Sequence, residues 1–118
     1  MKPATFAWRL TSAETIDIDE RFYVDSAYIP VDGDEIKLVL ARHPGAAAAL
    51  TLSTEDGSIV IDDVDLEIVP PAVQLRFHAD QPDGLSGVYD AELLLIRPDL
   101  IAVIGEGSVR IKIAIAKD

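Results

Sequence analysis

Hydrophobic side chains alternate with polar ones along much of this chain, and this two-residue period constrains its fold more than any other feature. Residues 108–116 give the clearest example, with β-branched residues at every second position: Val109, Ile111, Ile113 and Ile115. Because successive side chains of an extended strand point to opposite faces, this pattern predicts a strand with one buried face. A helix would spread the same four residues around its circumference.

The same period recurs in other segments, which are separated by turn-forming residues. Apolar residues occupy every second position in segments 16–18, 36–40, 50–52, 59–61 and 64–68. Asp56-Gly57 predicts a turn between two of these strands, because glycine readily adopts the positive φ that such turns need. Pro70-Pro71 is expected to end the strand over 64–68, since proline has no N–H to donate to a sheet.

A more continuous apolar run over residues 88–96 predicts a strand that is covered on both faces. The residues 97–99, Arg-Pro-Asp, are expected to interrupt it before a strand resumes over 100–104. Gly105 and Gly107 then predict a bulge or a tight bend before the last strand.

Two segments are ambiguous. Residues 72–79 fit a strand, which we favour, or a short helix that begins at Pro71. Residues 43–49 contain His-Pro-Gly followed by four alanines. Because four alanines are too few to nucleate a helix, a loop or turn between strands is favoured over one helical turn.

Short strands at intervals of about 8–12 residues predict an all-β, antiparallel two-sheet sandwich of about 8–10 strands. No segment has the pattern of a helix long enough for a parallel crossover. The chain has 118 residues, of which 49% are hydrophobic. That length suits a single domain over residues 1–118 with one substantial core.

The charge balance excludes two classes of partner. Lys and Arg number 10 and Asp and Glu number 21, so the formal net charge is −11. Such a chain repels phosphate backbones and anionic headgroups, so we expect no nucleic-acid partner and no membrane partner. Neither a signal peptide nor an apolar run of membrane-spanning length is recognisable, and we expect a soluble protein made in the cytoplasm.

No catalytic constellation is recognisable, so the sequence predicts a protein that is not an enzyme and has no catalytic residues and no cofactor. The absence of cysteine excludes disulfides, thiolate metal sites and thiol nucleophiles. His43 and His78 are interpreted as structural residues. Gly84-Leu85-Ser86-Gly87 lacks the spacing of a nucleophile elbow, and the segment 105–107 lacks the third glycine of a phosphate-binding fingerprint.

Three acidic clusters, at residues 17–20, 32–35 and 62–65, leave two alternatives open. Their carboxylates can collect calcium in principle, but none has the spacing of a known calcium loop, so solvated turns are favoured and no metal site is predicted. The second alternative is a small hydrolase that uses two of these carboxylates as its catalytic pair. A carbohydrate-binding module would need aromatic platforms, and the candidates are Trp8, Tyr23 and Tyr28, of which Trp8 is expected in the core.

Basic residues on one strand face stand out in so acidic a protein. Arg110 and Lys112 share the polar side of the last predicted strand. The favoured interpretation is cross-strand pairing with Asp90 and Glu92, at about 0.2–1 kcal/mol for each pair. The functional alternative is that the two cations meet an acidic face of a neighbouring subunit and set its orientation.

The segments 50–61, 87–93 and 105–111 together resemble small proteins of tailed-phage and prophage structural-gene clusters. They look like the N-terminal, immunoglobulin-like domain of phage baseplate upper proteins, in which a strand ends in Asp/Asn-Gly and a later strand carries Tyr-Asp-x-Glu. The resemblance covers about residues 35–115, and its most specific part is Tyr89-Asp90 with Glu92.

This resemblance implies a non-enzymatic virion protein of the tail or baseplate that is synthesised in the bacterial host cytoplasm. Its implied partners are copies of itself, as a homo-oligomer, and other phage tail or baseplate proteins. Tyr89 thereby joins Arg110, Lys112, Asp90 and Glu92 as an interface candidate. A small ligand-binding module, for carbohydrate or calcium, is the alternative function.

Overall fold

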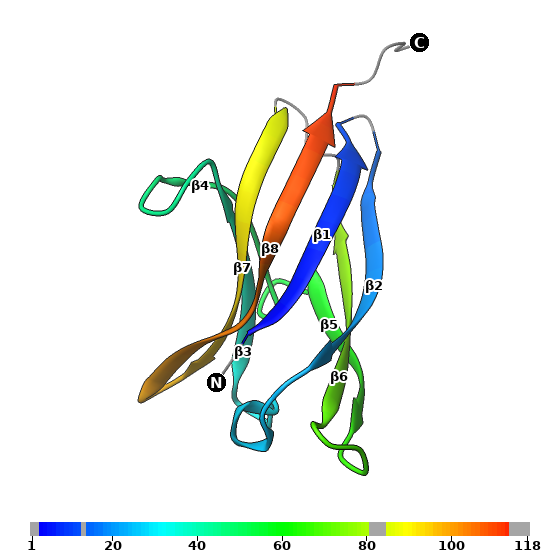
Figure 1. Ribbon diagram of the computed structural model, residues 1–118, viewed down its shortest axis with the longest axis vertical. Coiled ribbons are helices and arrows are strands. Elements are labelled where there is room, and N and C mark those ends of the chain that lie inside the picture. The colour runs from blue at the N-terminus through cyan, green and yellow to red at the C-terminus, as the bar shows by residue number, and fades with distance from the viewer. Residues whose placement is uncertain (1–2, 13, 81–84, 114–118) are drawn as a thin grey trace.

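Two β-sheets face each other in the computed structural model, which describes residues 3–12, 14–80 and 85–113 (Figure 1). The strands are β1 (Ala4–Thr11), β2 (Ile16–Tyr23), β3 (Glu35–Ala41), β4 (Ala48–Ser53), β5 (Ile59–Asp65), β6 (Ala72–Ala79), β7 (Gly87–Arg97) and β8 (Leu100–Lys112). A short 3-10 turn, η1 (Ser26–Tyr28), precedes β3. The predicted all-β, two-sheet sandwich is confirmed. Within the described ranges, no helix has the length and apolar character to cross a membrane.

The larger sheet has the strand order β1-β8-β7-β3-β4, and the smaller one has the order β2-β6-β5. Neighbouring strands are antiparallel except for β1 and β8, which run parallel with Ala4 opposite Gly105 and Thr11 opposite Lys112. The prediction of an antiparallel sandwich is therefore wrong for this pair. A parallel pair needs a long connection, and all the strands between the first and the last provide it.

Strand β6 resolves the first ambiguous segment. Residues 72–79 pair with β2 on one side and with β5 on the other, so they form a central strand and the helical alternative is wrong. Residues 42–46 form the turn before β4, so the helical alternative is wrong there too.

The hairpin of β7 and β8 confirms two predictions about its bends. Arg97 lies opposite Leu100, so the chain reverses where the interruption was predicted. The register then shifts, because Leu94 faces Val103 whereas Leu93 faces Gly105, and Ile104 is the extra residue of a bulge. Strand β8 ends at Lys112, and Ile113 lies beyond it and is 62% exposed, so its predicted place on the buried side of the strand is wrong. The predicted continuation over 114–116 lies outside the described residues, as does Gly84.

Three expectations need correction. Strand β5 ends at Asp65, which already pairs with Ala72, so residues 66–71 must turn and the strand predicted over 66–68 is wrong. The Asp56-Gly57 turn is present with φ +82° at Gly57, but it connects β4 and β5, which lie in different sheets. Double coverage of 88–96 is wrong along the outer side of the strand, where Val88, Asp90 and Glu92 are exposed and Leu94 and Ile96 are only half-buried.

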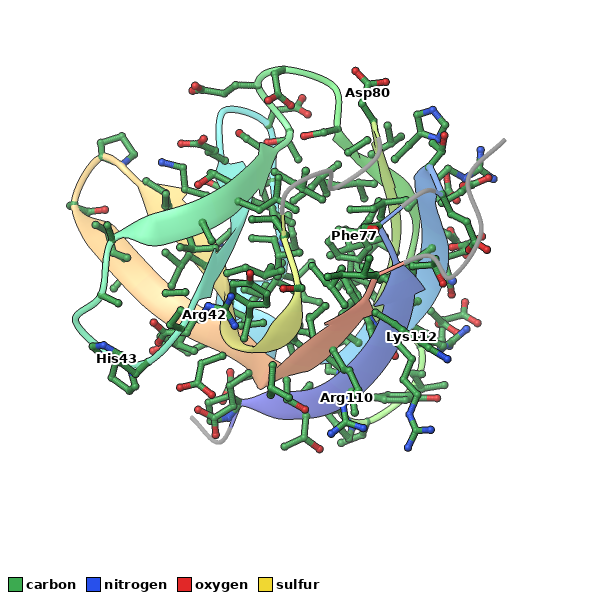
Figure 2. All side chains as sticks on the ribbon, turned by 90° about the horizontal axis from the view of Figure 1, so that it is seen from above. Arg42, His43, Phe77, Asp80, Arg110 and Lys112 are labelled. Atoms are coloured by element: carbon green, nitrogen blue, oxygen red, sulfur yellow. The ribbon has the colours of Figure 1, made fainter. Side chains whose placement is uncertain are left out.

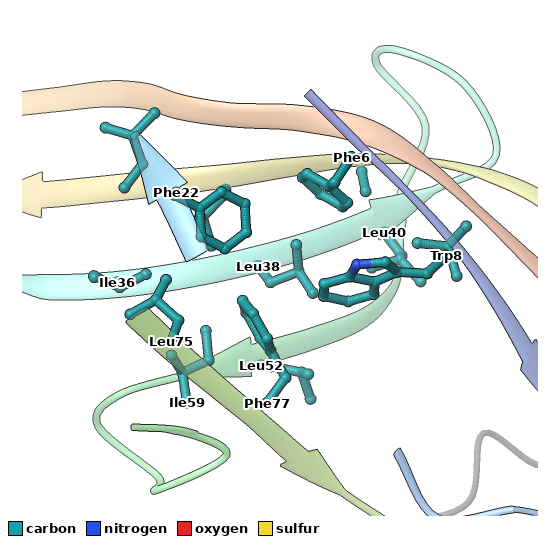
Figure 3. Packing of buried hydrophobic residues seen from close by; sticks show 14 of the residues in the cluster. Phe6, Trp8, Phe22, Ile36, Leu38, Leu40, Leu52, Ile59, Leu75 and Phe77 are labelled. Carbon is teal, nitrogen blue, oxygen red and sulfur yellow. The ribbon is translucent and has the colours of Figure 1, made fainter. Parts of the chain in front are cut away.

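Aromatic rings from both sheets meet in the core (Figure 3). Phe6 and Trp8 of β1 contact the smaller sheet, with ring centroids 5.8 Å apart for Phe6 and Phe22, and 4.9 Å apart for Trp8 and Phe77. Trp8 is only 8% exposed, which confirms its predicted place in the core. Edge-to-face pairs of this kind add about 0.5–1.5 kcal/mol each to the gain from burial. Among the described residues, the buried polar ones are Ser12 and Ser53, so charged groups that could act on a partner lie on the outer faces and loops.

Candidate functional site

The solvent side of the five-stranded sheet, which we call the outer face, carries the most distinctive arrangement of side chains. Strand alternation turns every second residue of β1, β3, β7 and β8 away from the core. The outward residues that concern us are Thr5, Ala7, Arg9, Val39, Ala41, Val88, Asp90, Glu92, Glu106, Ser108, Arg110 and Lys112.

One part of the outer face is a hollow of about 580 Å³, which we call the acidic groove. Asp90, Glu92 and Glu106 supply its carboxylates, and the turn over residues 43–46 lines it as well. The register places Glu92 of β7 directly opposite Glu106 of β8. Like charges in directly opposed positions destabilise a sheet, so this pair costs the isolated chain free energy.

Further along the same two strands, the charge changes sign. Arg9 of β1 lies directly opposite Arg110 of β8, and Lys112 follows two residues later. These three residues form what we call the basic end. Figure 2 shows Arg110 and Lys112 pointing away from the core, on the outer side of β1 and β8, with His43 at the distant turn. Arg9 and Arg110 are a second like-charge pair, and they too repel each other.

The predicted cross-strand ion pairs are wrong, and the register gives the reason. Asp90 lies opposite Ser108, Glu92 lies opposite Glu106, and Arg110 lies opposite Val88. The cations and the carboxylates therefore occupy separate levels of the sheet and do not neutralise each other directly.

Tyr89 does not belong to the outer face, so its place among the interface candidates is corrected. Tyr89 is only 2% exposed, because it lies on the side of β7 that faces the core. The Arg42 guanidinium lies 4.2 Å from the centre of the ring, and the Tyr89 hydroxyl accepts a hydrogen bond from the Ser86 N–H at 3.1 Å. These contacts give Tyr89 a structural role at the start of β7.

The three acidic clusters have partners within the protein. From 17–20, Asp19 accepts a hydrogen bond from the Gln74 side chain at 2.7 Å. From 62–65, Asp65 lies 3.2 Å from the Arg21 guanidinium. From 32–35, Asp34 lies 3.0 Å from the Arg97 guanidinium. Among the residues that the structure describes, no group of three or more histidine, aspartate or glutamate side chains is arranged to hold a metal ion.

The remaining sequence candidates lie away from the groove. Tyr23 is 52% exposed on β2 of the other sheet, and Tyr28 is half-buried in η1. His78 lies 3.9 Å from Asp17, also on the smaller sheet. His43 lines the groove, but its Nδ1 is 3.0 Å from the carbonyl oxygen of neighbouring Pro44. Phe6 is the one aromatic residue among the described residues lining the groove.

Comparison with known proteins assigns no family, since neither a protein-family model nor a curated protein matches the chain. The site is therefore defined by its geometry. Sequence reasoning missed Arg9 and Glu106, which complete the two like-charge pairs. The only sequence signal for these two residues was the strand alternation that turns them toward solvent. The sequence does not reveal which strands are neighbours, so it could not show that they complete the pairs.

Proposed function

We propose that the protein is a non-enzymatic assembly domain that binds protein partners through its outer face. The observation that carries this proposal is the pair of like-charge contacts, Glu92 with Glu106 and Arg9 with Arg110, on one side of one sheet. Each contact destabilises the isolated chain, and each is relieved when a partner places the opposite charge over it. Opposed charge groups on a rigid sheet also fix the orientation in which a partner binds.

The proposal extends to a place in the tail or baseplate of a phage or prophage particle, in contact with other tail or baseplate proteins. The sequence resemblance supports this, and so does an immunoglobulin-like arrangement of strands. In such folds one sheet contains strands B, E and D and faces a sheet that contains strands C, F and G. Here β2, β6 and β5 correspond in order to B, E and D, and β3, β7 and β8 correspond to C, F and G. The Tyr89 hydroxyl bound to the backbone at Ser86 resembles the tyrosine corner of that fold.

The experiment is incorporation into particles. Particles are purified by density gradient from an induced culture of the organism that encodes the chain, in which the chain carries a short tag. We expect the wild-type chain and a control, Glu67→Arg, to sediment with the particles. A Glu92→Arg/Glu106→Arg variant that keeps its β-sheet circular dichroism is expected to stay in the soluble fraction.

Two results would contradict the proposal. Absence of the wild-type chain from purified particles removes the phage placement. Equal incorporation of the doubly substituted variant removes the outer face as the contact surface. The control changes the net charge without touching that face, because Glu67 is an exposed loop residue beyond the end of β5.

A small ligand-binding module is the second candidate, and one observation favours it. The volume of the acidic groove falls within the range of about 300–1,000 Å³ that is typical of small-molecule sites. A ligand that binds only the folded chain raises the melting temperature. An increase with a glycan or with calcium that Glu92→Arg/Glu106→Arg abolishes would support this function, and an unchanged melting temperature would exclude those ligands.

A further inference from the structure

The acidic groove and the basic end lie on the same strand of the outer face, one on either side of Ser108. Glu106 precedes Ser108 by two residues and Arg110 follows it by two. At about 3.3 Å per residue, each charge lies about 7 Å from the midpoint along β8. Each is doubled by a like charge on the neighbouring strand, Glu92 for Glu106 and Arg9 for Arg110.

From this arrangement we infer that a second copy of the chain docks on the outer face. The two copies are related by a two-fold axis that lies midway between the faces, runs perpendicular to the strands and passes over Ser108 of β8. This operation reverses the strand direction and leaves each strand facing the same strand of the other copy, so Glu106 of each copy meets Arg110 of the other. Glu92 lies one strand to one side of this contact, and Arg9 of the other copy lies one strand to the other side. Such an interface is self-complementary, as two-fold symmetry requires. The inference deepens the proposed assembly function, on which it rests.

The centre of the outer face permits this approach. Ala7 of β1, Ser108 of β8 and Ala41 of β3 are small outward residues at the level of the proposed axis. Asp90 of β7 lies at the same level and faces Asp90 of the other copy, a repulsion that the two contacts between Glu106 and Arg110 must exceed. Stacked sheets lie about 10 Å apart, a gap that arginine and glutamate side chains bridge end to end. Glu106 and Arg110 therefore each gain a partner of opposite sign and form charge-assisted hydrogen bonds, with Glu92 and Arg9 placed diagonally beside them.

The size of the surface sets the expected affinity. Four inter-strand spacings of about 4.8 Å and eight residues of about 3.3 Å give a face of about 500 Å² for each copy. The two copies together would bury about 1,000 Å², the low end for specific interfaces, so the dimer is expected to dissociate in the micromolar range. Each copy also carries a net charge of −11, and this general repulsion opposes the local attraction.

A salt titration cannot test the register, because salt screens both the local attraction and the general repulsion. Charge-reversed variants change the local contacts and therefore test it. Sedimentation velocity is measured from about 1 to 500 µM for the wild type, Glu106→Arg, Arg110→Glu and the control Glu67→Arg. We expect the wild type and the control to dimerise. Each single reversal opposes like charges twice across the two-fold axis, so its dissociation constant is expected to rise by at least about tenfold.

The decisive step is to mix the two single variants in equal amounts. In the mixed pair, arginine at 106 of one copy meets glutamate at 110 of the other, and glutamate at 106 meets arginine at 110. The mixture, and separately the double variant Glu106→Arg/Arg110→Glu, are expected to regain dimerisation. Circular dichroism checks that each variant is folded.

Three results would overturn the inference: a monomeric wild type at the highest concentration, single variants that dimerise like the wild type, or a mixture that stays monomeric. Particle incorporation is a separate readout. If the chain enters particles but is monomeric in solution, the assembly function stands and the second-copy partner falls. If it dimerises but is absent from particles, the phage placement falls instead.

Discussion

Gly107 is the position where the structure makes its most severe steric prediction. It lies on β8 opposite Phe6 of β1, in the parallel pair. A Cβ atom added at Gly107 would lie 2.0 Å from the Phe6 carbonyl oxygen and 3.0 Å from the Phe6 ring. Close carbon–oxygen contacts in sheets are about 3.3–3.6 Å, so β1 would have to move by about 1.3 Å.

The cost of Gly107→Ala follows from that movement. A shift of this size breaks about two backbone hydrogen bonds between β1 and β8, at about 1 kcal/mol each. It also displaces Phe6, whose side chain is 7% exposed in the core, and overpacking of this kind costs at least about 1 kcal/mol. We therefore expect the free energy of unfolding to fall by about 3 kcal/mol, and the melting temperature by about 12 °C for a domain of this size.

Urea unfolding followed by circular dichroism measures this loss, and Gly105→Ala is the matched control. The nearest contact of a Cβ there is the Leu93 Cβ at 3.2 Å, which requires a shift of only a few tenths of an ångström. Both substitutions restrict the unfolded chain equally, so their difference isolates the clash with β1. A Gly107→Ala variant within about 0.5 kcal/mol of the control would refute the placement of β1 against β8.

The other predictions concern an ion pair, a turn and the acidic groove. Arg97 binds Asp34 at 3.0 Å and donates to two backbone carbonyls, and the Asp34 side chain is only 5% exposed. Arg97→Met leaves this buried carboxylate without a partner, so it is expected to lower the free energy of unfolding in urea by about 3 kcal/mol. An unchanged midpoint would contradict this. The Ser58 hydroxyl, followed by the Ser58 backbone N–H, lowers the pKa of Asp56 below its ordinary value of 3.8. This carboxylate therefore stabilises the fold above pH 3.8 and loses that contribution as the pH falls through the folded pKa. Carboxyl NMR should show that the pKa of Asp56 rises in Ser58→Ala, and an unchanged Asp56 titration would contradict the assignment. Glu106→Gln removes one member of a repelling pair, so at monomeric concentrations it is expected to raise the free energy of unfolding by about 0.2–1 kcal/mol, and a decrease would show that the repulsion is absent.

The two-residue period predicted most of the strands because each one buries a single face. The alternation around Leu38 and around Ile111 placed those residues in the core, where both are 1% exposed. The bulge near Gly105 was also predictable from glycine. The pattern failed beyond Asp65, because apolar residues such as Leu66 also occur in turns, and alternation over a few residues carries no information about pairing.

The candidate site was predicted only in part, because its chemistry depends on which strands are neighbours. The sequence places Arg110 on the polar side of its strand, and this much is confirmed. It does not show that Arg110 lies beside Arg9, since the first and last strands pair only after the whole sandwich forms. Register is set by long-range packing and turn geometry, so the two like-charge pairs become visible only in the folded structure.

The central claim, that Ser108 marks the centre of a two-fold contact between outer faces, is tested most directly by cysteine cross-linking. The chain has no cysteine, so Ser108→Cys and the control Glu67→Cys each introduce a single reactive site. With stacked sheets about 10 Å apart, a short bismaleimide should join two copies efficiently at position 108 and poorly at position 67. Equal yields at the two positions, or no joined dimer at position 108, would contradict the account.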